Sequence, residues 1–362
     1  MAEQKVAIIQ NRIHKGGRLQ VILALVRILN ERGVVPDIIT FESQIPQSEM
    51  SNRLVARTCV GYDLVINSSN TSLFLSGETR LLSYVHFPRK KRVLSPLRSI
   101  HLPGGPEKRF FRPADIPSLL SRIWYRKRDM LPARESLVAN SEFTREMILE
   151  SYPCLEKEQI GVVFPPVPME ETDSLPANKE RTTVVSLGRF SKEKKQLEQI
   201  KIATQLPGYT FIIAGFAKPG STYLKRCRSF INEGRVTNVK LCPNLPYNEL
   251  KTVLNSAAFF LHSMRNEPFG ITSVQAAAAG CLPVVHDSGG QREVVPLAEL
   301  RYTTADEAVA IFRSLREKSF SEQKKMAELV RTHVRRFNSR VFEEQMTGIL
   351  SRELKVVSHE HR

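Results

Sequence analysis

The sequence has few cysteines, and they are not arranged as a structural framework would need. It contains five cysteines in 362 residues, an odd number with no C-x-x-C pair. Disulfide frameworks use an even set of cysteines, and structural zinc sites use closely spaced pairs, so both classes are excluded. We interpret the five thiols as reduced side chains of an ordinary globular protein.

Long hydrophobic runs are also missing. The longest apolar stretch, Ala276–Val285, has about half the length of a membrane span and is interrupted by Gly280 and Pro283. The N-terminal segment MAEQKVAIIQN contains charge and a strand-like pattern where a signal peptide would have an apolar core. We therefore expect no membrane-spanning helix and a cytoplasmic protein.

Acidic residues are in the minority. The chain has 53 Lys and Arg against 37 Asp and Glu, a net charge of +16, and residues 89–134 alone hold thirteen basic and three acidic side chains. Within this segment, apolar residues at helical spacing in 119–124 precede the basic run Arg126, Lys127 and Arg128. The pattern predicts a basic amphipathic helix that meets an anionic membrane or an acidic acceptor, and a solvated basic face is the alternative.

The same surplus of positive charge raises nucleic-acid binding as an alternative. A single-strand binding surface interleaves basic and aromatic side chains so that bases can stack. Here the aromatic residues of 89–134 form two adjacent pairs, Phe110 with Phe111 and Trp124 with Tyr125. We therefore expect no nucleic-acid partner.

The length of the chain exceeds what one hydrophobic core usually serves, so we expect two domains. Short apolar strands alternate with amphipathic helices in both halves, a pattern typical of parallel sheets covered on both faces. We predict an α/β protein with two doubly wound, Rossmann-like domains that face each other across a cleft. The expected parts are a first domain at 1–170, a linker at 171–181, a second domain at 182–335 and a C-terminal helix at 336–362 that returns toward the first domain.

Three clusters of residues suggest a binding site near strand ends. Gly16 and Gly17 follow the first strand, where glycines let backbone N–H groups approach a phosphate, although a tight turn explains them equally well. In SLGRFSKEKK, Arg189 and Lys194 follow the first strand of the second domain. Two fixed cations there could bind an anionic leaving group, and two ordinary surface cations are the alternative.

The third cluster, SMRNEPFGITSVQAAAAGCLPVV, has the pattern of a strand, a loop, a helix and another strand. Glu267 precedes the helix, Phe269, Gly270 and Ile271 offer N–H groups at its first turn, and Gln275 lies about one turn further along. A carboxylate and an amide in these places could bind a sugar nucleotide whose diphosphate the N–H groups hold. An ordinary strand-to-helix turn with a solvated glutamate is the alternative.

Taken together, the ordered motifs KGG, YVHFP, VANSEFT, VVFPPV, SLGRFSKEK, EPFGITSVQAAAAGCLPVV and GGQREVV resemble the retaining glycosyltransferases of family 4, which have the GT-B fold. The resemblance spans residues from about 5 to 345. YVHFP and FPPV further resemble the mannosyltransferases that extend a lipid-linked oligosaccharide from the cytoplasmic side.

The resemblance implies a role for each matching residue. Gly16 and Gly17 would border the donor diphosphate, His86 would face the donor sugar, and Leu245 would border the nucleobase. The remaining positions would bind the diphosphate (Arg189, Lys194), the sugar hydroxyls (Glu267), or, through backbone N–H groups, the phosphates (Phe269, Gly270, Ile271).

Gln275 departs from the family, which has a glutamate there to bind the ribose. A hydrogen bond to a neutral group is weaker than one to an ionised group by about 1 kcal/mol, which corresponds to about fivefold in donor affinity. We therefore expect an active enzyme. A catalytically weak sugar-nucleotide-binding scaffold is the alternative that Gln275 motivates.

The function implied is transfer of a hexose with retention, most naturally mannose from GDP-mannose, to a hydroxyl of a lipid-linked or other anionic glycan acceptor. The leaving phosphate oxygen would take the acceptor proton. No Asp-x-Asp pair occurs in the sequence, so we expect neither a metal nor another cofactor. Peripheral contact with the cytoplasmic face of an anionic membrane completes the expectation.

Overall fold

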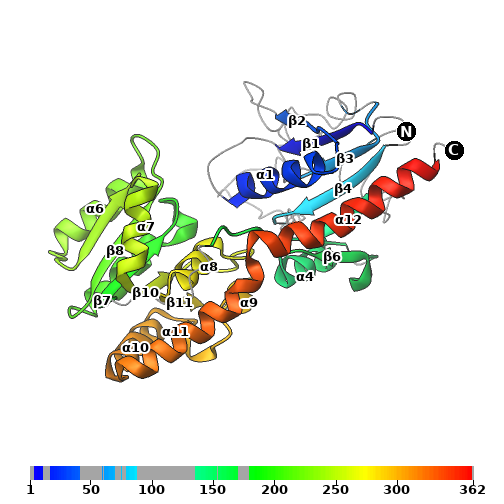
Figure 1. Ribbon diagram of the computed structural model, residues 1–362. Coiled ribbons are helices and arrows are strands. Elements are labelled where there is room, and N and C mark those ends of the chain that lie inside the picture. Colours follow the sequence, from blue (N-terminus) through cyan, green and yellow to red (C-terminus); the bar gives the residue numbers. More distant parts are fainter. Residues whose placement is uncertain are drawn as a thin grey trace, which may run out of the picture. The chain divides into compact units, whose positions relative to one another are not determined.

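The computed structural model describes residues 4–10, 17–40, 59, 61–69, 75, 79–87, 135–152, 154–169 and 179–360, with backbone only for 355–360. These residues form two compact units. One consists of Met1–Asn140, Thr144–Val163 and Gln345–Arg362, and the other of Ser141–Phe143 and Phe164–Glu344. Each unit contains one parallel sheet flanked by helices (Figure 1).

The sheet of the first unit has six described strands in the order β2-β1-β3-β4-β5-β6, and every neighbouring pair is parallel. Its central strands β1 and β3 are buried along their whole length, as expected for apolar runs covered on both faces. The strands are β1 (Val6–Gln10), β2 (Asp37–Thr40), β3 (Leu64–Asn67), β4 (Arg80–Val85), β5 (Glu135–Ala139) and β6 (Ile160–Val162).

Helix α1 (Gly17–Asn30) buries one face built from Val21, Leu25, Ile28 and neighbouring apolar residues, the spacing of an amphipathic helix. The unit also contains α4 (Glu142–Ser151) from Thr144 onward and the short 3-10 helix η2 (Lys157–Gln159).

The C-terminal helix α12 (Ser339–Glu360) contributes its residues from Gln345 onward to the first unit. Gln4 Nε2 donates to Leu354 O at 3.0 Å, and Arg32 Nη2 donates to Ser351 Oγ at 2.6 Å. Arg80 Nε lies 3.0 Å from Glu353 Oε2. Polar contacts from three distant segments therefore hold this helix in the unit.

The helix predicted at 336–362 begins three residues later in the structure. Helix α11 (Phe320–Val334) is followed by the 3-10 helix η5 (Arg335–Phe337), and α12 begins at Ser339. Asn338 Oδ1 accepts the N–H of Val341 at 2.8 Å, so Asn338 caps the new helix.

The sheet of the second unit has six described strands in the order β12-β11-β10-β7-β8-β9, again all parallel. Counted from β7, this is the Rossmann order 3-2-1-4-5-6, which reverses between β7 and β10. The strands are β7 (Glu180–Leu187), β8 (Thr210–Gly215), β9 (Val239–Pro243), β10 (Ala257–His262), β11 (Leu282–His286) and β12 (Arg301–Tyr302). The predicted doubly wound α/β fold is confirmed in both units.

Helices cover both faces of the second sheet. Val184 of β7 packs into a core with α5 and α10, whereas its neighbour Val185 packs into a separate core with α7, as strand alternation requires. The helices are α5 (Gln196–Thr204), α6 (Thr222–Glu233), α7 (Tyr247–Ser256), α8 (Ile271–Ala278), α9 (Gln291–Val294), α10 (Ala305–Glu317) and α11, with 3-10 helices η3 (Lys192–Lys194) and η4 (Ala298–Leu300).

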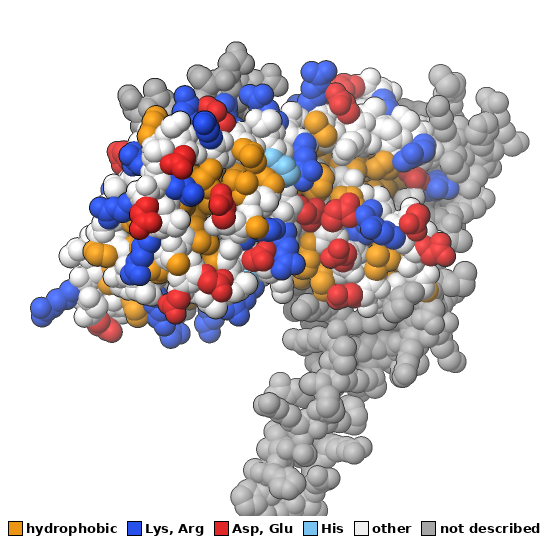
Figure 2. All heavy atoms as spheres, turned by 90° about the horizontal axis from the view of Figure 1, so that it is seen from below, with side chains coloured by type: hydrophobic (Ala, Val, Ile, Leu, Met, Phe, Trp, Pro, Cys, Tyr) orange, Lys and Arg blue, Asp and Glu red, His pale blue; other side chains and the backbone are white. Residues whose placement is uncertain are grey.

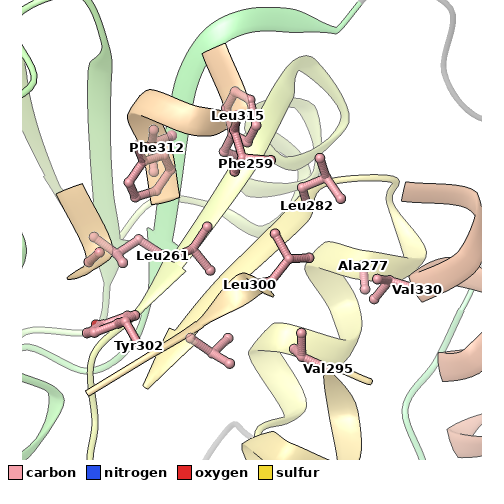
Figure 3. Close-up of a cluster of buried hydrophobic side chains, with 14 of the residues drawn as sticks. Phe259, Leu261, Ala277, Leu282, Val295, Leu300, Tyr302, Phe312, Leu315 and Val330 are labelled. Carbon is pink, nitrogen blue, oxygen red and sulfur yellow. The ribbon is translucent and has the colours of Figure 1, made fainter. Parts of the chain in front are cut away.

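The larger core of this unit joins strands, helices and loops into one cluster (Figure 3). Phe259 and Leu261 of β10 and Phe312 of α10 are fully buried there. The ring of Phe312 meets that of Phe259 edge to face with centroids 5.9 Å apart. The strand that leads to the candidate site is therefore fixed by close packing.

Charged side chains of both signs alternate over the face displayed in Figure 2. The predicted basic amphipathic helix falls within residues 89–134, outside the described residues, and so do Arg126, Lys127 and Arg128. Within the described part of the chain, no helix combines the length and apolar character needed to cross a bilayer.

Candidate active site

Two residues predicted from separate motifs meet in the second unit. Lys194 lies in η3 after β7, and Glu267 lies in the loop after β10. These neighbouring strands flank the point where the strand order reverses, so their carboxyl ends bring the two side chains together. Lys194 Nζ donates a hydrogen bond to Glu267 Oε2, and both side chains are largely buried.

A buried histidine, which the sequence analysis did not identify, completes this cluster. His262 ends β10, its Nε2 lies 3.2 Å from Glu267 Oε2, and it is only 3% exposed. Its other ring nitrogen, Nδ1, lies 3.2 Å from Nε2 of Gln291, the first residue of α9. The side chains of Lys194, Glu267, His262 and Gln291 thus form a continuous polar chain.

Burial and these contacts act in opposite directions on Glu267. Burial raises the pKa of the carboxyl, but the hydrogen bond from His262 and the charge of Lys194 outweigh it and hold the pKa at about 2. Burial lowers the pKa of His262, although Glu267 opposes this shift. Near neutral pH the arrangement is therefore a carboxylate beside a neutral imidazole.

The two oxygens of Glu267 differ in their surroundings. Oε2 is contacted by both Lys194 and His262, whereas Oε1 accepts no hydrogen bond from any described residue. A carboxylate oxygen has two lone pairs available for donors. Oε1 can therefore accept hydrogen bonds from the hydroxyl groups of a ligand.

Glycines allow the loop that carries Glu267 to pack against the segment after β11. Gly289 has φ +66°, and a Cβ there would lie 2.4 Å from Glu267 O. A Cβ at Gly290 would lie 2.4 Å from Pro268 O, and Gly290 N donates to Glu267 O at 2.8 Å. The motifs EPFG and GGQ therefore form one interlocked structure that only glycine permits.

Helix α8 begins directly after this loop. Gly270 is its N-cap with φ +113°, and the first intrahelical bonds run from Ser273 N and Val274 N to Gly270 O. The earlier N–H groups, including that of Ile271, have no acceptor within the helix. The Phe269 ring is buried with its centroid 5.0 Å from that of Phe337, which anchors the start of the helix.

The remaining predicted residues of the second unit are not joined to this cluster. The side chain of Arg189 is 63% exposed, and its Nη2 lies 3.7 Å from Oε2 of Glu193, four residues along the chain. Leu245 is half-buried and packs near the core beneath α7. Gln275 is half-buried on α8, without a described side-chain partner.

The other predicted residues belong to the first unit. Gly17 is the first residue of α1, and Gly16 lies outside the described residues. His86 follows β4, is 8% exposed, and its Nε2 lies 2.9 Å from Ser68 Oγ. Burial, aided by the charge of Arg18, lowers the pKa of His86 to about 3, so its imidazole is neutral.

In the described part of the chain, no group of three His, Cys, Asp or Glu side chains is placed to hold a metal ion.

Comparison with solved structures identifies the class of fold. A glycosyltransferase from Rickettsia africae superimposes with a TM-score of 0.68 at 13% identity, covering 98% of this chain and all of that one. HepE from Anabaena, in complex with UDP and glucose, gives a TM-score of 0.67 at 16% identity over 96% of this chain and 99% of that one. The chain has the GT-B fold of two Rossmann-like domains.

Sequence comparison gives a narrower likeness. Residues 169–331 match the model of the family described as glycosyl transferases group 1. The GDP-Man:Man(3)GlcNAc(2)-PP-Dol alpha-1,2-mannosyltransferase of Xenopus laevis is 29% identical over 231 residues, 58% of this chain and 46% of that protein. The protein of the same name from Mus musculus is 27% identical over 299 residues, 74% of this chain and 59% of that protein.

These comparisons confirm the predicted resemblance to GT-B glycosyltransferases and to the lipid-linked-oligosaccharide mannosyltransferases. These relatives are named as mannosyltransferases, which are hexosyltransferases. The chain spans about half to three fifths of the length of these curated relatives.

Proposed function

We propose that this protein is a retaining glycosyltransferase that moves a hexose, mannose from GDP-mannose, to a hydroxyl of a lipid-linked or other anionic glycan. The observation that carries the proposal is the different environment of the two carboxylate oxygens of Glu267. One oxygen is held by Lys194 and His262, while the other is left for ligand hydroxyls, in a segment that matches the glycosyl transferases group 1 model.

Donor binding would use groups around this carboxylate. Glu267 Oε1 would accept hydrogen bonds from sugar hydroxyls, and the N–H groups of Phe269, Gly270 and Ile271 at the start of α8 would bind the diphosphate. Arg189 is exposed, and exposed ion pairs such as that with Glu193 contribute little free energy. Turning Arg189 toward a bound diphosphate would therefore cost little.

The chemical step needs negative charge to be stabilised on the departing diphosphate. Lys194 and Arg189 would supply the compensating positive charge, together with the N-terminus of α8. The bond from the anomeric carbon to the phosphate oxygen breaks as the bond to the acceptor oxygen forms on the same face. The acceptor proton goes to the leaving phosphate oxygen, so the scheme is balanced without a metal or cofactor.

Residues from both units have further proposed roles. In the first unit, Gly16 and Gly17 would border the diphosphate, and the neutral imidazole of His86 would act at the donor sugar. In the second unit, Leu245 would border the nucleobase and Gln275 the ribose.

The identity of the donor rests on the relatives. The curated relatives are named as GDP-mannose-dependent transferases that act on a dolichyl-diphosphate-linked glycan, whereas HepE was solved with UDP and glucose. The higher sequence identity of the former favours GDP-mannose. A screen should therefore compare GDP-mannose with UDP-glucose, recording nucleotide release and the anomeric configuration of the product by NMR.

Matched lysine variants give this test a control. Lys194→Ala should abolish most transfer, whereas Lys192→Ala, which removes an exposed lysine of the same 3-10 helix, should leave it unchanged. Nucleotide-sugar binding without transfer or donor hydrolysis would instead favour the scaffold motivated by Gln275. No binding of any nucleotide sugar would refute both.

The acceptor is proposed to be presented at the cytoplasmic face of a membrane. The basic segment 89–134 would contact anionic lipid, because each basic residue near such a surface contributes about 1 kcal/mol. Wild-type protein should sediment with anionic liposomes at low salt and release at roughly 0.5 M salt through screening. Changing Arg126, Lys127 and Arg128 to Glu should abolish sedimentation and spare donor affinity. Undiminished sedimentation would favour a soluble acceptor.

A further inference from the structure

We propose that His262, oriented by Gln291, is a positioning residue that keeps Glu267 ionised and leaves Oε1 free for the donor sugar. The inference rests on the proposed function for its substrate, but its geometry belongs to the second unit alone. His262 Nε2 is 3.2 Å from Glu267 Oε2, and His262 Nδ1 is 3.2 Å from Gln291 Nε2.

The contacts on the two ring nitrogens specify one tautomer. A carboxylate oxygen is only an acceptor, so the Nε2 that approaches Glu267 must carry the proton. Burial keeps the imidazole neutral, and a neutral ring carries one proton, so Nδ1 is an acceptor. The amide N–H of Gln291 supplies the donor that this acceptor needs.

The amide of Gln291 is itself held in place by this contact. Gln291 is completely buried, and its Oε1 has no hydrogen-bond partner among the described residues. The contact with His262 is therefore the side-chain polar contact that orients the amide. Gly270 leaves room for it, because a Cβ at this position would lie 2.5 Å from Gln291 Nε2.

Glu267 needs a second stabilising partner because Lys194 has two proposed partners of its own. This lysine pairs with Glu267 in the structure, and the proposed function also requires it at the donor diphosphate. When Lys194 shares its charge with a phosphate, the buried Glu267 loses part of the attraction that holds it ionised. The N–H of His262 does not move with the lysine, so it keeps both the charge and the orientation of the carboxylate.

Two amide substitutions separate this role from a merely structural one. His262→Gln can place an amide N–H near the position of the imidazole Nε2, whereas His262→Asn is one methylene shorter and cannot reach Glu267. We expect His262→Gln to stay within about fivefold of wild-type kcat/KM for the donor. We expect His262→Asn to lose on the order of 10²-fold, because small misplacements of a positioning group have effects of this size.

The pH dependence provides the readout that a structural role would not change. The charged and titratable groups that face Glu267 are Lys194 and His262. In His262→Asn the carboxylate loses one of its stabilising contacts while it stays buried, so its pKa should rise by one unit or more. The acid limb of kcat/KM should move to higher pH in His262→Asn and should not move in His262→Gln.

A titration of Glu267 by carbon-13 NMR, assigned with Glu267→Gln, measures the same shift without any substrate. Inactive wild-type protein would refute the proposed function, while the titration would still decide the role of His262. An unchanged pKa of Glu267 in His262→Asn would overturn the inference, as would equal losses of activity in His262→Asn and His262→Gln.

Gln291→Leu provides a second route if His262→Asn fails to fold. Without the amide, Nδ1 of His262 loses its hydrogen-bond donor and the ring is oriented by Glu267 alone, so we expect a several-fold loss of kcat/KM and a smaller upward shift of the Glu267 pKa. Wild-type values for both quantities in Gln291→Leu would remove Gln291 from the inference.

Discussion

His86 of the first unit and His262 of the second are both buried histidines near the end of a strand, but they have different neighbours. Each lies at the carboxyl end of a parallel strand, each is buried, and burial lowers the pKa of each. His262 faces a carboxylate and an amide, whereas Nε2 of His86 faces the hydroxyl of Ser68 at 2.9 Å. A hydroxyl can donate or accept, so it does not select a tautomer.

The difference shows that burial alone does not give a histidine its role. Both imidazoles are neutral, but only the ring of His262 is obliged to donate from one nitrogen and accept at the other. Both ring nitrogens of His262 are therefore engaged, and the ring serves to hold Glu267 in place. The ring of His86 can exchange the roles of its nitrogens when a ligand arrives, as a group that acts on a reacting substrate requires.

The largest expected effect concerns the two cations of the second unit that are proposed to stabilise the departing diphosphate. Lys194→Ala should lower turnover by on the order of 10² or more, because it removes a charge that stabilises the departing diphosphate. Arg189→Ala should have an effect of similar size, although the side chain of Arg189 is exposed. Steady-state kinetics with Lys192→Ala as the control measures both, and wild-type turnover in the two variants would contradict the proposed function.

The next effect concerns the first unit. His86→Ala should lower kcat by about tenfold or more while donor affinity changes by less than about threefold, if the imidazole acts mainly in the transition state. His262→Asn, in contrast, should weaken donor binding as well. Donor titrations beside kinetics would separate the two histidines, and equal losses of turnover and affinity in His86→Ala would make it a binding residue.

The dependence of the free energy of unfolding on acidic pH tests the lowered pKa of His86. The pKa of His86 is about 3 in the folded protein against 6.5 for an ordinary histidine, so between these values the unfolded chain binds the extra proton. Stability should therefore fall as the pH drops from 6.5 toward 3, by up to ~1.4 kcal/mol per pH unit from this group. Urea denaturation of wild type and His86→Phe across this range should show a shallower slope for the variant, and parallel slopes would argue against the lowered pKa.

The smallest expected effect lies on α8. Gln275→Glu should tighten donor binding severalfold, because a carboxylate accepts stronger hydrogen bonds from ribose hydroxyls than an amide does. Isothermal titration with the free nucleoside diphosphate measures this directly. Weaker binding would show that the pocket has been built around glutamine.

The strands, and the proximity of Lys194 to Glu267, could be predicted from the pattern of the sequence. Apolar runs identify buried parallel strands, and residues just after neighbouring strands share one edge of the sheet. The sequence motifs place Lys194 and Glu267 just after neighbouring strands, and the two side chains are paired in the structure.

His262 and Gln291 could not be found in this way. Their contact depends on a loop with positive φ at Asn266 and Gly270, and on glycines that let the segment after β11 approach it. In the sequence His262 only ends an apolar strand, and Gln291 follows a glycine pair. The break before α12 was missed for a similar reason, since Asn338 interrupts an otherwise helical pattern by capping a new helix.

Helix α12 also sets an order of events during synthesis. The first unit includes residues from Gln345 onward, but the whole segment between Val163 and Gln345 belongs to the second unit. At ~5–20 residues per second, a ribosome needs roughly 10–40 s to translate those ~180 residues. During that time Gln4, Arg32 and Arg80 lack the partners that α12 later provides. The first unit is therefore completed only after the second unit has been translated, and the surface against which α12 packs stays exposed in the nascent chain for that time.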